Sequence, residues 1–121
     1  MKDIDQTNYN MQNIEKRASF VMTLPNDGIR YFEILKPPPS VTMRSGLVTL
    51  AAGDEVGAHT TGSNEEILVI LEGQGWVETE GLDERSIAAG QIAYIPPETR
   101  HNVFNRSDQP LRYIFIVARA Q

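Results

Sequence analysis

Two histidines and a nearby glutamate are the residues of this chain best suited to metal chemistry. His59 and His101 are its only histidines, and it contains no cysteine. A thiolate site is therefore excluded, and any metal ion must be held by nitrogen and oxygen atoms. His59 lies two residues before Thr61, so both side chains face the same side of a short strand. The turn at residues 62–64 ends this strand, so the alternation of side chains between the two faces starts anew after it. If His59 faces inward, a hairpin sets Glu66 beside it.

The strands expected around these residues determine which side chains accompany them. Glu66 shares a strand face with Leu68 and Ile70, and His101 shares one with Val103. Short β-rich runs separated by Gly, Asp, Asn or Pro are typical of an antiparallel sandwich or barrel. The expected strands cover residues 42–51, 56–61, 66–71, 74–80, 85–87, 91–95, 101–105 and 111–117. The chain is thus expected to be all-β.

An N-terminal arm is expected to precede this barrel. Residues 20–24 and 29–35 are predicted to form a hairpin, and a short helix opened by Asn10 is expected before it. Residues 37–39 are three consecutive prolines, which cannot donate ladder hydrogen bonds. They therefore mark a stiff connection between the arm and the main body.

Length and composition indicate one globular domain. The chain has 121 residues, of which 40% are hydrophobic and 22% are charged, and this balance is typical of folded proteins. We place the arm and hairpin in residues 1–39 and the barrel in residues 40–121. The net charge of −5 leaves no basic surface to neutralise phosphates, which argues against a nucleic-acid partner. No leader-like or membrane-spanning apolar run is present, so we expect a soluble, cytoplasmic protein.

Two runs, residues 67–71 and 113–117, are apolar at every position. In a sheet with one solvent-exposed face, apolar and polar residues alternate along each strand. We therefore expect the outer side of both strands to be covered. Either the arm or a second subunit can cover it, and a homodimer is the more economical expectation. The alternative is that the other sheet and the arm cover both runs within one monomer.

The spacing of glycines, prolines and histidines resembles the two motifs of the cupin superfamily. The first motif is a glycine, five residues, a histidine, one residue, a second histidine, three or four residues, a glutamate, six residues and a glycine. It is matched by Gly53, His59, Glu66 and Gly73. The second motif is a glycine, five residues, a proline, one residue, a glycine, two residues, a histidine, three residues and an asparagine, matched by Gly90, Pro96, His101 and Asn105. The resemblance covers residues 53–105 and implies a double-stranded β-helix, or jelly-roll, barrel.

Two positions depart from these motifs. Thr61 stands where the family usually has its second histidine, and Glu98 stands where it has a glycine. The resemblance therefore implies an open metal site with three ligands, His59, Glu66 and His101. Two imidazoles and one carboxylate suit Fe(II), and the same set also accepts Zn, Mn, Ni or Co. Because glutamate enters positive φ less readily than glycine, we expect the turn at Glu98 to be reshaped.

Several alternatives stay open at this site. The family spacing also allows Glu65 as the carboxylate ligand, although the six residues before Gly73 favour Glu66. Either histidine can instead be a core or turn residue bonded to the backbone. Arg44, the one charged residue of its strand, can hold an anionic ligand or lie on the wet face. The ligand pocket is expected to include Thr61, Leu68, Val103 and Arg44.

Two classes of function follow. The first is a metal-dependent cupin, such as an oxygenase, isomerase or lyase, that acts on a small oxygenated substrate, although no separate general base is identifiable. The second is a non-catalytic cupin that binds or senses a small ligand, or a structural cupin that has lost its metal. Because histidines bind metal only when neutral, we expect occupancy to fall below about pH 6.5.

Overall fold

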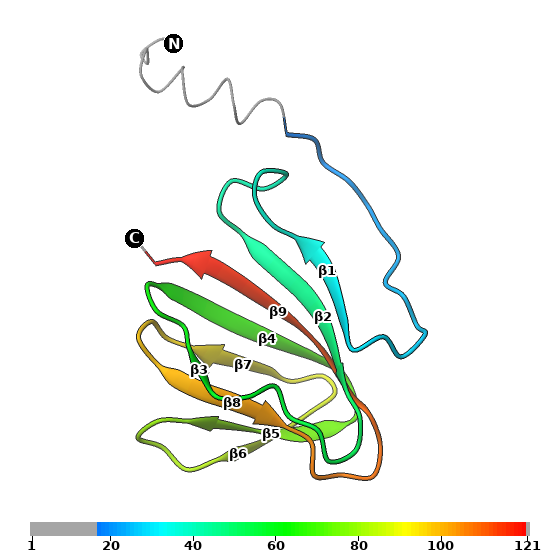
Figure 1. Cartoon of the computed structure of the whole chain (residues 1–121), viewed down its shortest axis with the longest axis vertical. Coiled ribbons are helices and arrows are strands. Elements are labelled where there is room, and N and C mark those ends of the chain that lie inside the picture. The colour runs from blue at the N-terminus through cyan, green and yellow to red at the C-terminus, as the bar shows by residue number, and fades with distance from the viewer. Residues whose placement is uncertain (1–16, 121) are drawn as a thin grey trace.

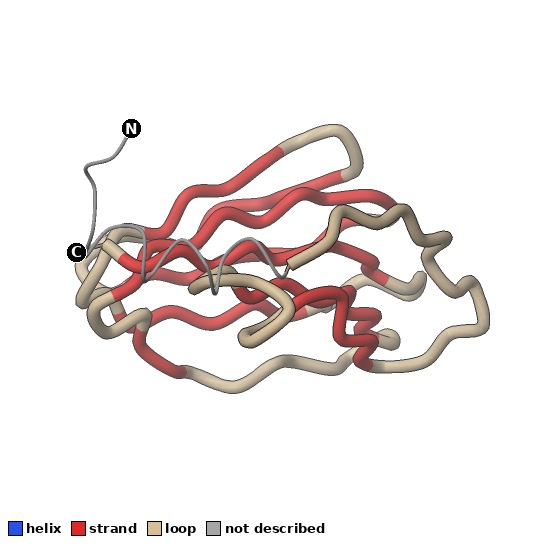
Figure 2. The backbone as a smooth tube through the Cα atoms, turned by 90° about the horizontal axis from the view of Figure 1, so that it is seen from above, coloured by secondary structure: helices blue, strands red, loops and turns tan. Residues whose placement is uncertain are grey.

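The computed structural model describes residues 17–120, which form two antiparallel β-sheets. Figure 2 shows strands and loops along this part of the chain and no helix, which confirms the all-β prediction. The helix expected at Asn10 lies outside the described residues. Between residues 17 and 120 there is consequently no helix long and apolar enough to cross a membrane.

The chain alternates between the two sheets in the manner of a jelly roll. The larger sheet has the order β1 (Tyr31–Leu35), β2 (Arg44–Leu50), β9 (Leu111–Arg119), β4 (Asn64–Glu72) and β7 (Ile92–Ile95). The smaller sheet has the order β3 (His59–Thr60), β8 (Arg100–Phe104), β5 (Gln74–Thr79) and β6 (Arg85–Ala88). In Figure 1 the last strand, β9, lies between β2 and β4, so segments distant in sequence become neighbours.

The inward faces of the two sheets form the hydrophobic core. Along β4, Leu68 and Ile70 point inward and are almost fully buried, whereas Ile67 and Val69 on the outer face are only partly buried. The core is completed by Val48, Leu50, Val77, Ile87, Ile95, Val103, Leu111 and Tyr113. Burying one such large apolar side chain contributes about 1.5–3 kcal/mol. This shared burial holds the two sheets together.

The predicted N-terminal hairpin is wrong in its first strand. Residues 20–24 form no strand, while the second predicted strand is present as β1. This strand pairs with β2 and sets Phe32 opposite Leu47. An isolated two-stranded hairpin is only marginally stable, whereas the edge of β2 offers both ladder hydrogen bonds and a larger sheet. β1 therefore joins the barrel and not the arm.

The arm contacts the outer face of the larger sheet at one hydrogen bond. Arg112 faces outward on β9, and its Nη2 donates a 2.7 Å hydrogen bond to the carbonyl oxygen of Pro25. At the far edge of this sheet, Ile92 and Tyr94 are 63% and 56% exposed. The second subunit expected on this face stays a prediction. Sedimentation analysis of the purified chain tests it, and a monomeric mass would contradict it.

Candidate functional site

Three strands bring His59, Glu66 and His101 together. β3 pairs with β8 so that His59 lies opposite His101, with 4.3 Å between the ring centroids. Glu66 extends inward from β4, and its Oε1 lies 3.3 Å from His101 Nε2. One potential ligand atom from each residue lies within 4.8 Å of the other two. Two ligands bound to one ion at about 2.1 Å are at most about 4.2 Å apart, so small side-chain shifts complete the set.

Hydrogen bonds to the backbone orient both imidazole rings. His59 Nδ1 lies 2.8 Å from the carbonyl oxygen of Gly57, and His101 Nδ1 lies 3.1 Å from that of Thr99. Because a carbonyl oxygen can only accept, each Nδ1 carries the proton and donates it. The lone pair of each Nε2 is then free to bind a metal ion, and the backbone carbonyl fixes this tautomer.

The buried polar atoms of the site lack other partners. His101 is 3% exposed, and its Nε2 is a buried atom whose nearest charged neighbour is Glu66 Oε1, at 3.3 Å. The Glu66 side chain is 10% exposed, and no residue from 17 to 120 donates a hydrogen bond to its carboxylate. Unpaired buried polar groups cost free energy. A divalent cation satisfies both groups at once, so these residues fit a metal ion.

Glu66 also controls the protonation of His101. Burial by itself lowers the pKa of His101, but the Glu66 carboxylate and the Thr99 carbonyl favour the imidazolium form. The net result is a pKa above the ordinary value of 6.5. A proton and a metal ion therefore compete for the same pair of side chains.

The three side chains line a cavity of about 380 Å³, which we call the metal cavity. Val103 and Arg44 line it too. Arg44 pairs with Val117, another lining residue, so it sits on the inner face of β2. Leu68, which was expected in the pocket, is instead fully buried in the core and is not among the residues that line the cavity.

Thr61 lines the metal cavity, but its hydroxyl group is engaged by the backbone. Its Oγ1 donates a 2.7 Å hydrogen bond to the Pro96 carbonyl and accepts one of 3.1 Å from the Thr99 amide. Thr61 thus holds the turn that leads into His101. The expected reshaping of this turn is wrong, since Glu98 takes a φ of 53° and so keeps a conformation typical of glycine.

Two tyrosines reach the metal cavity, and neither was predicted from the sequence. Tyr113 faces inward with Phe115 on β9. Because residues 113–117 are all apolar, the sequence does not show which of them face inward. Tyr31 stacks on Phe115 with 6.1 Å between ring centroids. A Cβ atom at Gly46 would lie 2.6 Å from the Tyr31 ring and 2.9 Å from that of Phe115. Glycine at this position therefore lets the two rings form one wall of the cavity.

Glu65 does not compete for the site. It accepts a 2.8 Å hydrogen bond from the hydroxyl group of Tyr94 on the outer face of the sheet. Asn105, from the second motif, secures the turn after β8: its Nδ2 donates to the carbonyl of Leu50 at 3.0 Å, and its Oδ1 accepts from the amide of Ser107 at 2.9 Å. Glu66 is thus the carboxylate that faces the two histidines.

Comparison with known proteins identifies the family. The family model described as "Cupin domain" matches residues 46–117. The uncharacterized protein MJ1618 of Methanocaldococcus jannaschii is 28% identical over 93 residues, which cover 75% of this chain and 74% of that protein. The structure of a cupin protein from Bacteroides fragilis has a TM-score of 0.73 and 25% identity, with 84% of each chain covered.

A further solved structure, the cupin domain of Schizosaccharomyces pombe Cnp3, has a TM-score of 0.66 and 19% identity. It matches 74% of this chain, but this chain covers only 63% of that one, which is less than two thirds of its length. Its likeness shows the fold alone. The family model, in contrast, spans more than half of the sequence, and the chain therefore belongs to the cupin family.

Proposed function

We propose that this cupin holds one divalent metal ion through His59, Glu66 and His101 and acts on a small, oxygenated, anionic substrate. The observation that carries the proposal is the convergence of the buried His101 Nε2, which makes no hydrogen bond, with the Glu66 carboxylate and a second imidazole. Fe, Zn, Mn, Ni and Co all accept this donor set. When bound, such an ion supplies Lewis-acid activation of an oxygen atom.

Arg44 supports the anionic character of the substrate. It lines the metal cavity, and its guanidinium group makes no hydrogen bond or ion pair with any residue from 17 to 120. A guanidinium group binds a carboxylate through two parallel hydrogen bonds. We therefore assign Arg44 to the anionic group of the substrate, which sets the orientation of the substrate relative to the metal ligands.

Tyr113 contributes a hydrogen-bond donor. Burial and the neighbouring Glu66 carboxylate raise the pKa of Tyr113 far above its ordinary value of 10.0, so the phenol stays protonated at neutral pH. Its hydroxyl group has no hydrogen-bond partner among residues 17–120. It therefore serves as a donor to a substrate oxygen and not as a general base. Val48, Val103 and Phe115 line the cavity as apolar neighbours and limit the access of water.

The proposal covers those oxygenase, isomerase and lyase reactions in which an oxygen atom of the substrate or of dioxygen is activated. It also keeps the cytoplasmic location expected from the sequence. The competing function is a cupin that binds or senses a small ligand without metal. Metal content separates the two.

Metal analysis of protein purified without chelators tests the proposal. We expect close to one equivalent of a divalent metal per chain, and loss of that metal in the double variant His59→Ala, His101→Ala. Unchanged metal content in this variant contradicts the assignment of the ligands. A wild-type chain that is folded but takes up none of the five metals supports the ligand-binding function instead.

A further inference from the structure

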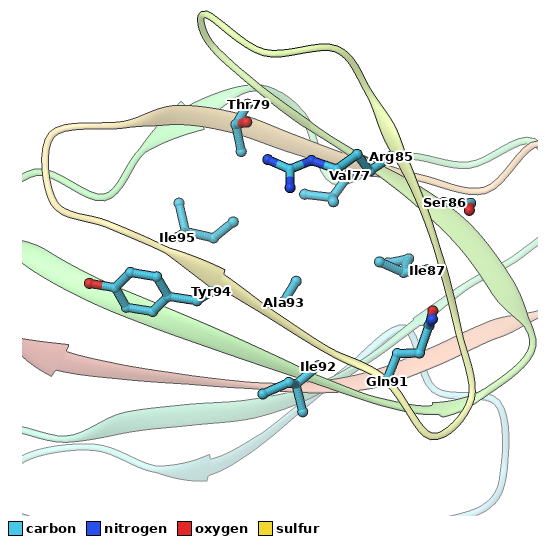
Figure 3. A pocket seen from close by; sticks show the side chains of 10 residues that line it. All are labelled: Val77, Thr79, Arg85, Ser86, Ile87, Gln91, Ile92, Ala93, Tyr94 and Ile95. Atoms are coloured by element: carbon cyan, nitrogen blue, oxygen red, sulfur yellow. The ribbon is translucent and has the colours of Figure 1, made fainter.

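A second cavity, of about 510 Å³, lies between the edges of the two sheets. β6 is the last strand of the smaller sheet and β7 the last strand of the larger one, so neither is paired on its other side within residues 17–120. Figure 3 shows the side chains that line the space between them. None of these residues lines the metal cavity. The second cavity, here called the Arg85 cavity, is therefore a separate compartment.

Arg85 reaches into this compartment because of its strand register. It pairs with Val77 across β6 and β5, so both side chains lie on the inward face of the smaller sheet. Ile87, two residues further along β6, faces the same way and is buried. Figure 3 shows the guanidinium group of Arg85 directed into the space between Thr79 and Ile95.

The guanidinium group of Arg85 has no partner within the part of the chain that the structure describes. Its side chain makes no hydrogen bond or ion pair with any residue from 17 to 120. The chain carries 16 acidic residues, yet none of them lines this cavity. Arg85 is an exposed residue, so a ligand can reach its guanidinium group. The planar guanidinium group matches the geometry of a carboxylate.

Part of the wall next to Arg85 is apolar. Val77, Ile87 and Ile95 are buried core residues, and Ala93 packs against them. The Thr79 hydroxyl group lies on the same strand face as Val77, two residues along β5, and adds a polar group near the guanidinium end. The cavity thus combines one cationic group with apolar side chains and with the neutral polar side chains of Ser86 and Gln91. Its volume falls within the roughly 300–1,000 Å³ typical of small-molecule sites.

We propose that the Arg85 cavity binds a small monocarboxylate. The carboxylate group pairs with the guanidinium group of Arg85, and a short hydrocarbon chain packs on Val77, Ile87, Ala93 and Ile95. This ligand class differs from a metal ion in charge and in the groups that recognise it. The site does not depend on the metal ligands and holds whether or not the metal cavity is catalytic.

Titration of sodium hexanoate into the ¹⁵N-labelled full-length chain tests this proposal by the amide chemical shifts. We expect saturable shifts at Val77, Ile87 and Ala93. Arg85→Gln should weaken binding by at least about tenfold, because it removes a charge-assisted bidentate pair. Hexan-1-ol, which has the same hydrocarbon chain without the carboxylate, should bind the wild-type chain at least about tenfold more weakly for the same reason.

Arg44→Gln is the matched control, because it removes the same charge from the metal cavity. It should leave the dissociation constant of hexanoate at the Arg85 cavity unchanged, as should His59→Ala, so failure of the metal site and failure of this site are distinguishable. The proposal is overturned if no saturable shift occurs at these amides, or if Arg44→Gln abolishes the shifts. It is also overturned if Arg85→Gln binds as tightly as the wild type, in which case Arg85 only protects the open edge of β6 from pairing.

Discussion

The metal cavity and the Arg85 cavity lie between the same two sheets, but only the metal cavity contains a cluster of metal-ligating side chains. The metal cavity gathers two imidazoles and a carboxylate and also includes Arg44, whereas the Arg85 cavity has one cation beside apolar and neutral polar side chains. The two cavities share a wall. Glu66 pairs with Ile95 across β4 and β7, and His101 pairs with Thr79 across β8 and β5. In each pair, the first residue lines the metal cavity and the second lines the Arg85 cavity.

The difference shows that neighbouring residues on paired strands of one barrel can line two cavities suited to different ligands. Side chains directly opposite each other on neighbouring strands are about 5 Å apart, so one layer of residues divides the compartments. On one side the Glu66 carboxylate and the two imidazole groups favour a cation where they meet, while Arg44 lines the same cavity. On the other, an unpaired guanidinium group favours an anion. Substitutions on either side of the wall should therefore affect one ligand and not the other.

Glu66→Gln should separate the two cavities most strongly. The neutral amide removes the only negative charge among the three ligands, and we expect metal affinity to fall by about 100-fold or more, since even residues outside the ligand set can change it by about 10–100-fold. Competition with a chromophoric chelator measures the change. Hexanoate binding in the Arg85 cavity should stay as in the wild type.

The matched control for this substitution is Glu65→Gln. It makes the same chemical change one residue away, where the carboxylate accepts a hydrogen bond from Tyr94 on the outer face. Metal affinity should stay close to that of the wild type. Equal losses in the two variants would show that net charge, and not ligation by Glu66, governs metal binding.

Ligand binding in the two cavities should also differ in its response to pH, with a smaller effect than that of Glu66→Gln. Because the pKa of His101 lies above 6.5, protons begin to compete with the metal ion above that pH, and not only below it. Metal affinity should fall by about tenfold per pH unit for each proton that must be displaced. Metal titrations between pH 5 and 8, at about unit steps, measure this. Hexanoate binding should be flat from neutral pH down to about pH 6, because arginine and a carboxylate both stay charged there.

The metal-free chain should show the opposite dependence in its stability. A raised pKa in the folded state means that the folded chain binds the His101 proton more tightly than the unfolded chain does. This contribution to the free energy of unfolding is fully present below pH 6.5, and it is lost as the pH rises through the folded pKa. Urea unfolding of chelator-treated protein measures it. The contribution should be absent in His101→Ala, and its persistence there would assign it to another group.

The metal cavity could be predicted from the sequence because its residues match the spacing of the cupin motifs. The resemblance implied the ligand set of His59, Glu66 and His101, although β3 has only two residues and does not show by itself which way His59 faces. The inward direction of Arg85 depends instead on its register with β5, and no motif marks Arg85 as a site residue. The strand that pairs with β1 was also predicted wrongly. Tertiary contacts, and not the local sequence, decide that β1 pairs with β2 and not with residues 20–24.

The turn from β7 to β8 joins a strand of the Arg85 cavity to a strand of the metal cavity, and it offers the smallest expected effect. Glu98 in this turn has a φ of 53°, which costs a residue with a side chain about 1–2 kcal/mol relative to glycine. Its amide donates a 2.8 Å hydrogen bond to the carbonyl of Gly62, and this bond does not require the side chain.

Glu98→Gly should therefore stabilise the fold, by about 1 kcal/mol or less, since the greater freedom of glycine in the unfolded chain offsets part of the gain. Thermal unfolding should show a midpoint up to about 4 °C higher. Glu98 lines neither cavity, so metal and hexanoate affinities should not change. Glu78→Gly, which replaces a glutamate within β5, should lower the midpoint instead. If both variants lower it, the Glu98 side chain contributes more to the turn than its backbone conformation costs.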